Sequence, residues 1–284
     1  MADREVFSNA PLRLVSLELR YPVTSRVLTR KVWDAFEQAL RWELPKVDVL
    51  ASDAANYVPT GVYDGVLRRS TEDRKRVVTL HAGAVTVELA DYKRYDDLLQ
   101  LARPTLDAME ALSEDLVCTH MGLRYINEVP ANAVQAEAEG NWGDPTLWAP
   151  FVNDELLRTT NDVPPGLCSF GYRAMLLMHS VLDADASHVA LDYGPHPHGL
   201  VPDGAVDLGE DSGPCFRLDI DCYAPGSAQE PIASDRNQAL AVLDQLHEAA
   251  ESTFHWSITE RLKEEVFRAP TQGNDGEVRH AANA

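Results

Sequence analysis

A histidine and an arginine share one face of the segment at residues 116–129, the most strand-like stretch of the chain, which contains GLRYIN. Side chains alternate between the two faces of a strand, so His120, Gly122 and Arg124 are expected on one side. A guanidinium is a planar donor for carboxylates and other anions, and a glycine beside it leaves room for a ligand near the backbone. The segment therefore predicts an anion-binding or carboxylate-binding face.

The alternative role of Arg124 is structural. Its planar fork matches a carboxylate in a two-bonded ion pair, so an acidic residue on a neighbouring strand, such as Glu88 or Asp219, would fix the strand register. This interpretation is favoured over ligand binding, although both uses are compatible with one surface.

A second polar face is predicted in CFRLDIDCY, residues 215–223, where apolar and charged residues alternate. Asp219 and Asp221 lie two residues apart, a spacing that puts both carboxylates on one side of a strand. Such a pair can hold a divalent cation or divide acid and base roles, or it can simply pair with arginines. We expect the two faces together to form a ligand-binding or partner-binding surface made of His120, Arg124, Arg217, Asp219 and Asp221.

A metal site is a weaker prediction, centred on Asp192, His196 and His198 within LDYGPHPHG. Imidazole and carboxylate ligands suit zinc, iron or manganese. However, H-x-H occurs by accident in loops rich in proline and glycine, and no motif such as H-E-x-x-H supports the site.

No reaction class follows from the sequence, because it contains no Walker loop, dinucleotide fingerprint, G-x-S-x-G elbow or kinase motif. The leading hypothesis is a non-enzymatic binding or adaptor protein without a cofactor. The alternative is a metal-dependent hydrolase that uses the Asp/His loop and the paired aspartates. The sequence is compatible with either an enzyme or a binding protein.

Composition limits the kinds of partner. The chain has 284 residues and a formal net charge of −20, which disfavours nucleic acid and anionic membrane surfaces. It contains no apolar run long enough to span a bilayer and no signal-peptide core, so a cytoplasmic protein is expected. The four cysteines form no CxxC pair, which fits a reducing compartment.

These faces need a sheet and helices to position them. Alternation predicts strands near residues 12–21, 46–52, 76–92, 116–129, 166–183, 187–193 and 215–223, and helical spacing predicts helices near 24–44, 94–113, 235–250 and 257–267. The order indicates an α+β fold, mainly antiparallel sheet with helices packed on one face. Two similar strand-helix-strands-helix halves are expected, at residues 1–130 and 131–268, before a disordered tail at 269–284.

Four segments, VELADYKRYDDLL, GLRYIN, LDIDCY and FHWSITERLKEEV, occur in this order along the chain. In them the sequence resembles an uncharacterised, sporadically distributed prokaryotic family of about the same length. The resemblance implies a bacterial or archaeal cytosolic protein and brings no catalytic residue with it. An accessory role in a bacterial multi-protein system is the corresponding expectation. The partner would be another protein, bound by an exposed sheet face or the C-terminal helix, and self-association is an open alternative.

Overall fold

The fold is taken from a computed structural model of the chain. It describes residues 7, 9–22, 30–51, 65–81, 83–110, 117–134, 142–157, 174–179, 187–200 and 205–268. The predicted tail from residue 269 lies outside the described residues, as do parts of the strand expected at 166–183.

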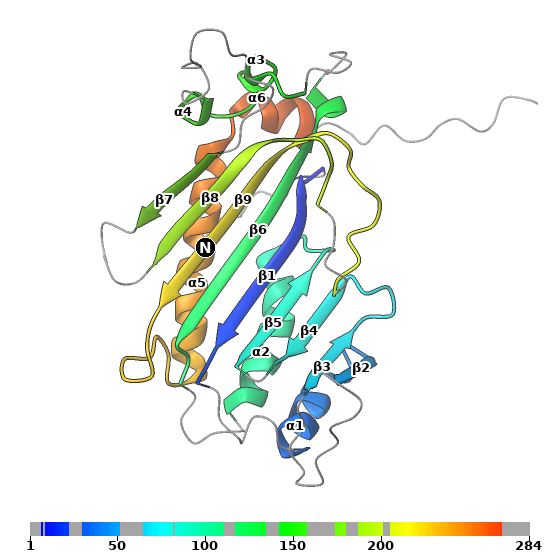
Figure 1. Ribbon diagram of the computed structural model, residues 1–284, viewed down its shortest axis with the longest axis vertical. Coiled ribbons are helices and arrows are strands. Elements are labelled where there is room, and N and C mark those ends of the chain that lie inside the picture. Colours follow the sequence, from blue (N-terminus) through cyan, green and yellow to red (C-terminus); the bar gives the residue numbers. More distant parts are fainter. Residues whose placement is uncertain are drawn as a thin grey trace, which may run out of the picture.

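Nine strands of the described part form one antiparallel sheet, in the order β2-β3-β4-β5-β1-β6-β9-β8-β7 (Figure 1). Their bounds are β1 Leu12–Arg20, β2 Lys46–Ala51, β3 Gly65–Ser70, β4 Arg76–Leu80, β5 Ala84–Leu89, β6 His120–Pro130, β7 Ala174–His179, β8 His188–His196 and β9 Cys215–Pro225. The sheet arises from the expected alternation. In β1, for example, Val15, Leu17 and Leu19 are buried on one face.

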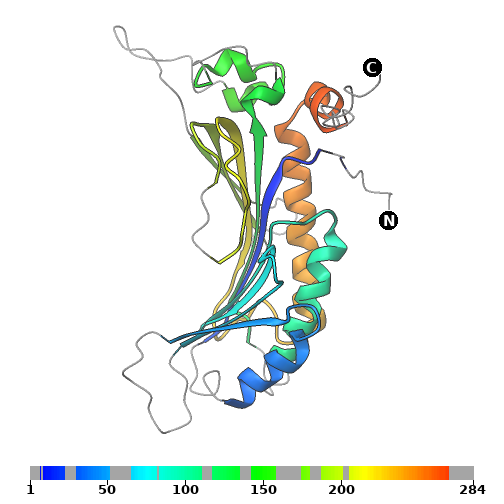
Figure 2. The same cartoon turned by 90° about the vertical axis from the view of Figure 1, so that its right-hand side faces the viewer.

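In the described part of the chain, three long helices cover one face of this sheet and no helix lies on the other (Figure 2). They are α1 Arg30–Leu40, α2 Tyr95–Glu110 and α5 Arg236–Ser257. The predicted α+β class with helices on one face is therefore confirmed. Shorter elements gather beyond one end of the sheet, namely η1 Ala131–Val134, α3 Pro145–Trp148, α4 Asp154–Leu157, α6 Glu260–Leu262 and a π-helical turn, η3 Lys263–Phe267 (Figure 1).

A similar order of elements occurs twice along the described part of the chain. The first run is β1, α1, four strands and α2. The second run starts at β6, before the boundary expected after residue 130, and continues with short helices, three strands and α5. In each half the first strand lies at the sheet centre and the last strand pairs beside it, so β1 and β6 meet in the middle. One buried core runs through both halves, which share a single sheet.

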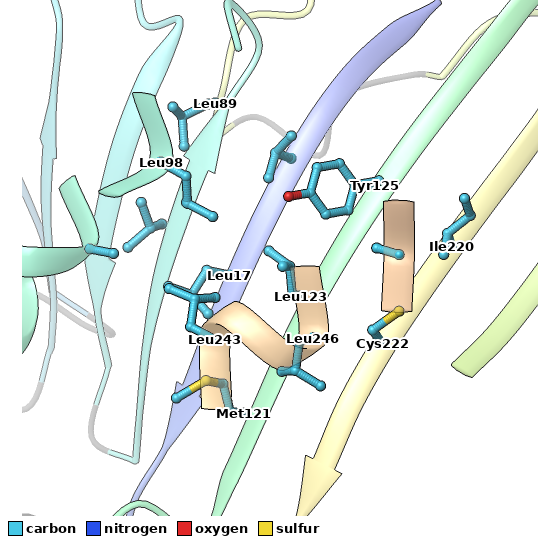
Figure 3. Close-up of a cluster of buried hydrophobic side chains, with 14 of the residues drawn as sticks. Leu17, Leu89, Leu98, Met121, Leu123, Tyr125, Ile220, Cys222, Leu243 and Leu246 are labelled. Atoms are coloured by element: carbon cyan, nitrogen blue, oxygen red, sulfur yellow. The ribbon is translucent and has the colours of Figure 1, made fainter. Parts of the chain in front are cut away.

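The main core lies between the sheet and the helices. Leu17, Leu123 and Cys222 project from β1, β6 and β9 toward Leu243 and Leu246 of α5 (Figure 3). These apolar residues leave water together, which is the main stabilising contribution of this face. The polar residues between them on each strand must then face the opposite side.

That opposite side, here called the open face, is partly covered by the connection between β8 and β9. Val206 and Leu208 of this connection are buried against Val77 of β4 in a second, small apolar cluster. The covered part lies over one end of the central strands. At its other end, where no other described element covers it, the open face carries His120, Arg124 and Asp221 (Figure 1).

α2 includes Pro104 and ends at Glu110, close to the predicted range of 94–113. One predicted helix start is wrong. Ser257 ends α5 instead of opening the next helix, and the cap of α6 is Thr259, whose hydroxyl accepts a hydrogen bond from the Leu262 N–H. No helix in the described part of the chain is long and apolar enough to cross a membrane.

Candidate functional site

The uncovered part of the open face holds a cavity of about 290 Å³, here called the open-face cavity. Three neighbouring strands of the sheet, β1, β6 and β9, line it with Ser16, Glu18, Arg20, His120, Gly122, Arg124, Asp221 and Tyr223. These strands are paired side by side, with Ser16 opposite Arg124 and Arg124 opposite Asp221. The cavity floor is therefore set by backbone register.

Arg124 and Asp219 form the ion pair that the sequence predicted. Arg124 Nε donates to Asp219 Oδ1 at 2.7 Å and Nη2 donates to Oδ2 at 2.5 Å. Asp219 lies diagonally across from Arg124, because Asp221 is the residue directly opposite. The hydrogen bonds to Asp219 are the largest cause of the raised pKa of Arg124. Arg124 is therefore always charged, and the Asp219 carboxylate balances its charge.

Replacing Arg124 with alanine is expected to lower the free energy of unfolding by about 1–3 kcal/mol, because the Asp219 carboxylate loses both donors. The lower end of this range is favoured, since the Arg124 side chain is 49% exposed and water can replace part of the pair. Urea unfolding measures the change. Arg124→Lys keeps the charge without the fork and should lie between alanine and the wild type. Equal stability of all three proteins would contradict a structural role.

Glu18 and Arg20 make a second ion pair at the rim, between neighbouring positions on the same side of β1. Arg20 Nε donates to Glu18 Oε1 at 2.8 Å and Nη2 donates to Oε2 at 3.1 Å. The bond to Glu18 raises the pKa of Arg20. Both guanidinium groups of the cavity are thus neutralised by carboxylates.

Asp221 differs from these acids, because it accepts no hydrogen bond from the described part of the chain. It stands beside Gly122, where an added Cβ would meet Asp221 Oδ1 at 3.8 Å and His120 Nε2 at 3.3 Å. The glycine leaves the space that both side chains use. Burial raises the pKa of Asp221, and the attraction of Arg124 opposes this only in part. Its carboxylate is therefore attracted by the nearby Arg124 cation without receiving a hydrogen bond from it.

A row of rings borders this carboxylate. The Tyr223 ring lies 5.9 Å from His120 and 5.2 Å from His188, measured between ring centroids. Burial lowers the pKa of His120, and the nearby Arg20 cation lowers it further. His120 is therefore expected to be neutral near pH 7. A planar cation could contact this row and Asp221 together.

Arg217 shares the open face but does not line the cavity. Its guanidinium donates to Glu128 Oε1, with distances of 3.1 Å from Nε and 2.8 Å from Nη2. The Glu128 side chain has no exposed surface, and Arg217 is 16% exposed. Of the residues predicted to share one surface, the structure places Arg217 beside Glu128 and outside the cavity lining. Arg217 belongs to the attachment of the β8–β9 connection.

The predicted metal trio does not come together. Asp192 pairs opposite Asp219 and His196 opposite Cys215, four positions apart along β8, which corresponds to about 13 Å. His198 is 74% exposed and its Nδ1 lies 3.5 Å from Asp211 Oδ2. In the described ranges, no group of three or more His, Cys, Asp or Glu side chains is arranged to hold a metal ion.

The sequence prediction missed the contribution of β1 to this site. Ser16, Glu18 and Arg20 alternate with apolar residues as in the other strands, but nothing in the sequence places β1 beside β6. Tyr223 follows the predicted Asp219 and Asp221 at the same spacing of two. Continuing that alternation by one step would have found it.

Comparisons with known proteins add no further constraint. A scan against protein-family models finds no match for this chain, and a search of the curated proteins finds none either. The resemblance to a prokaryotic family therefore stays a prediction, and any function has to be argued from the site itself.

Proposed function

We propose that the protein is a cytoplasmic, non-enzymatic binding protein that takes an arginine side chain of a partner protein into the open-face cavity. The observation that carries this proposal is the state of Asp221. Arg20 and Arg124 are neutralised by Glu18 and Asp219, so Asp221 is left as a half-buried carboxylate without a donor. A buried charge of this kind favours a ligand that brings the missing partner.

An arginine fits the cavity better than a lysine does. Its guanidinium is planar and matches a carboxylate with two parallel hydrogen bonds, and it also stacks on aromatic rings. Besides Glu18, which is paired with Arg20, the cavity offers the Asp221 carboxylate and an adjacent ring, Tyr223, with His120 beside it. The net charge of −20 would attract a basic partner at long range. A place in a bacterial multi-protein system is consistent with such a partner and forms part of the proposal.

The test uses a blocked arginine, N-acetyl-arginine amide, and its neutral isostere N-acetyl-citrulline amide. Binding is followed by NMR shifts of the Gly122 and Tyr223 amides at 150 mM salt. We expect the arginine compound to bind and the citrulline compound to bind at least about tenfold more weakly, because a charge-assisted pair is lost. Equal affinity, or shifts that avoid these two residues, would refute the proposal.

A matched pair of variants extends this test to the whole partner. Asp221→Asn should lose a protein that co-purifies from the native host, whereas Glu248→Gln should retain it. Glu248 is an exposed acid on α5, on the far side of the sheet, so its replacement removes the same charge away from the cavity. A partner retained by both variants would bind elsewhere and would contradict the assignment.

A further inference from the structure

A second and larger cavity, of about 550 Å³, lies on the helix-covered side of the sheet. It is here called the helix-side cavity. Its walls come from the N-terminal segment at residues 7–12, the start of α2, β6 and α5. The volume is within the range of small-molecule sites, roughly 300–1,000 Å³. Because its lining shares no residue with the open-face cavity, the proposed arginine site does not account for it.

Aromatic rings in fixed mutual orientations form much of the helix-side cavity. The Tyr95 ring is stacked on His247, with centroids 4.0 Å apart and an angle of 11° between the planes. Tyr92 meets Tyr125 edge to face at 5.7 Å. Phe254 of α5 also lines the cavity. Such a wall is preorganised for a flat, apolar molecule, since its rings need no rearrangement to contact one.

The floor of the helix-side cavity is polar and ordered. The Tyr125 hydroxyl lies 2.9 Å from His247 Nδ1, and Asn127 beside it is buried. Burial raises the pKa of Tyr125, so its hydroxyl stays protonated at neutral pH. A few placed polar groups within an apolar wall are typical of sites that orient one ligand.

The mouth of the helix-side cavity is cationic. Lys93 and Arg94 line it and are exposed. Their backbone N–H groups donate to Asp97 Oδ2, which caps the start of α2. In the described part of the chain, however, neither side chain has an ion pair or hydrogen bond. Glu251 is the one acid among the described residues that line this cavity. Such a pair of cations can accept an anionic group.

We propose that the helix-side cavity binds a planar aromatic or heteroaromatic molecule that carries a carboxylate or phosphate group. The ring lies against Tyr92, Tyr125 and Phe254, and the anionic group reaches Lys93 and Arg94. This site is independent of the open-face cavity, so either proposal can fail alone.

The test compares three probes of one ring system by calorimetric titration at pH 7.5: naphthalene-2-carboxylate, 2-naphthyl phosphate and the neutral naphthalene-2-carboxamide. At least one anion should bind about tenfold more tightly than the amide, and which anion binds better separates the two head groups. Arg94→Ala should remove most of this preference. Arg103→Ala, which removes an exposed cation further along α2, should not. No binding, equal binding of the amide, or an unchanged preference in Arg94→Ala would overturn the proposal.

A second variant tests the ring contact. Tyr92→Ala should weaken the binding of both anions and of the amide by about tenfold, because the naphthalene ring of each probe loses its contact with the Tyr92 ring. Retained binding of N-acetyl-arginine amide, or an unchanged circular dichroism spectrum, shows that the variant is folded. A folded Tyr92→Ala protein that binds all three probes like the wild type would show that they bind elsewhere.

Discussion

Replacing Glu128 with alanine is expected to lower the free energy of unfolding by about 3–5 kcal/mol. Among the described residues, Glu128 is the carboxylate that pairs with both Arg13 and Arg217 in a buried network, and the substitution removes it. Glu128 Oε1 accepts from Arg217 and from the Leu200 N–H at 2.6 Å, while Oε2 accepts from the Ser212 hydroxyl at 2.8 Å. Arg13 Nε lies 3.4 Å from Oε2. The substitution leaves the positive charges of Arg13 and Arg217 without the carboxylate that they share.

This network also attaches the β8–β9 connection to the open face. Arg13 Nη2 donates to the carbonyls of Leu208 and Glu210, so the same side chains join β1, β6 and the connection. Glu128→Gln keeps the shape and should be intermediate. Chemical denaturation measures both variants, and a double-mutant cycle with Arg217→Met measures the coupling. A Glu128→Ala protein within about 1 kcal/mol of the wild type would show that the network contributes little.

Replacing Asp221 with asparagine is expected to reduce the affinity for N-acetyl-arginine amide at least about thirtyfold. Truncating one side of a desolvated, hydrogen-bonded charge pair costs roughly 2–5 kcal/mol of binding free energy. The asparagine has the same shape, so the cavity is preserved and only the charge is lost. Asp221→Asn with wild-type affinity, measured by the same NMR titration, would exclude the carboxylate as the anchor.

The same substitution should stabilise the free protein at neutral pH. Burial raises the pKa of Asp221 above that of the unfolded chain, so the folded state binds a proton more readily. Stability contributed by this group is present at low pH and is lost as pH rises through the raised pKa. Asp221→Asn removes the ionisable group and with it this loss of stability. Its unfolding free energy should exceed that of the wild type at pH 7, and the difference should shrink on acidification.

The alternation of side chains along strands carried the correct part of the sequence prediction. His120 and Arg124 share a face of β6, and Asp219 and Asp221 share a face of β9, because the period of a strand is fixed at two residues. The chemistry of a guanidinium predicted a carboxylate partner for Arg124 but left Glu88 and Asp219 open as candidates. The choice of Asp219 follows from the pairing of β6 with β9, which the sequence did not give.

The errors concern position along the strand and contacts distant in sequence. Arg217 shares the face of Asp219 and Asp221, but it lies directly opposite Glu128 of β6 and pairs with it, and it also donates to the His198 carbonyl of the β8–β9 connection. The proximity of Asp192 and His196 in sequence suggested a metal site, although an extended strand separates residues that a helix would bring together. The helix-side cavity draws on four separate segments, so no single motif reveals it.

Acidification should weaken arginine binding in the wild type. Protonation of Asp221 removes the anchor charge as pH falls through its raised pKa. In Asp221→Asn the pH dependence should disappear. A wild-type affinity that rises on acidification would contradict this assignment of charge.

The most direct test is an NMR titration of the side-chain carboxyl carbon of Asp221 in the free protein and with saturating N-acetyl-arginine amide. We expect a pKa above the ordinary aspartate value of about 3.9 in the free protein, and a fall when the ligand supplies the missing cation. A carboxyl whose pKa is ordinary in the free protein and unchanged by the ligand would contradict the proposed function.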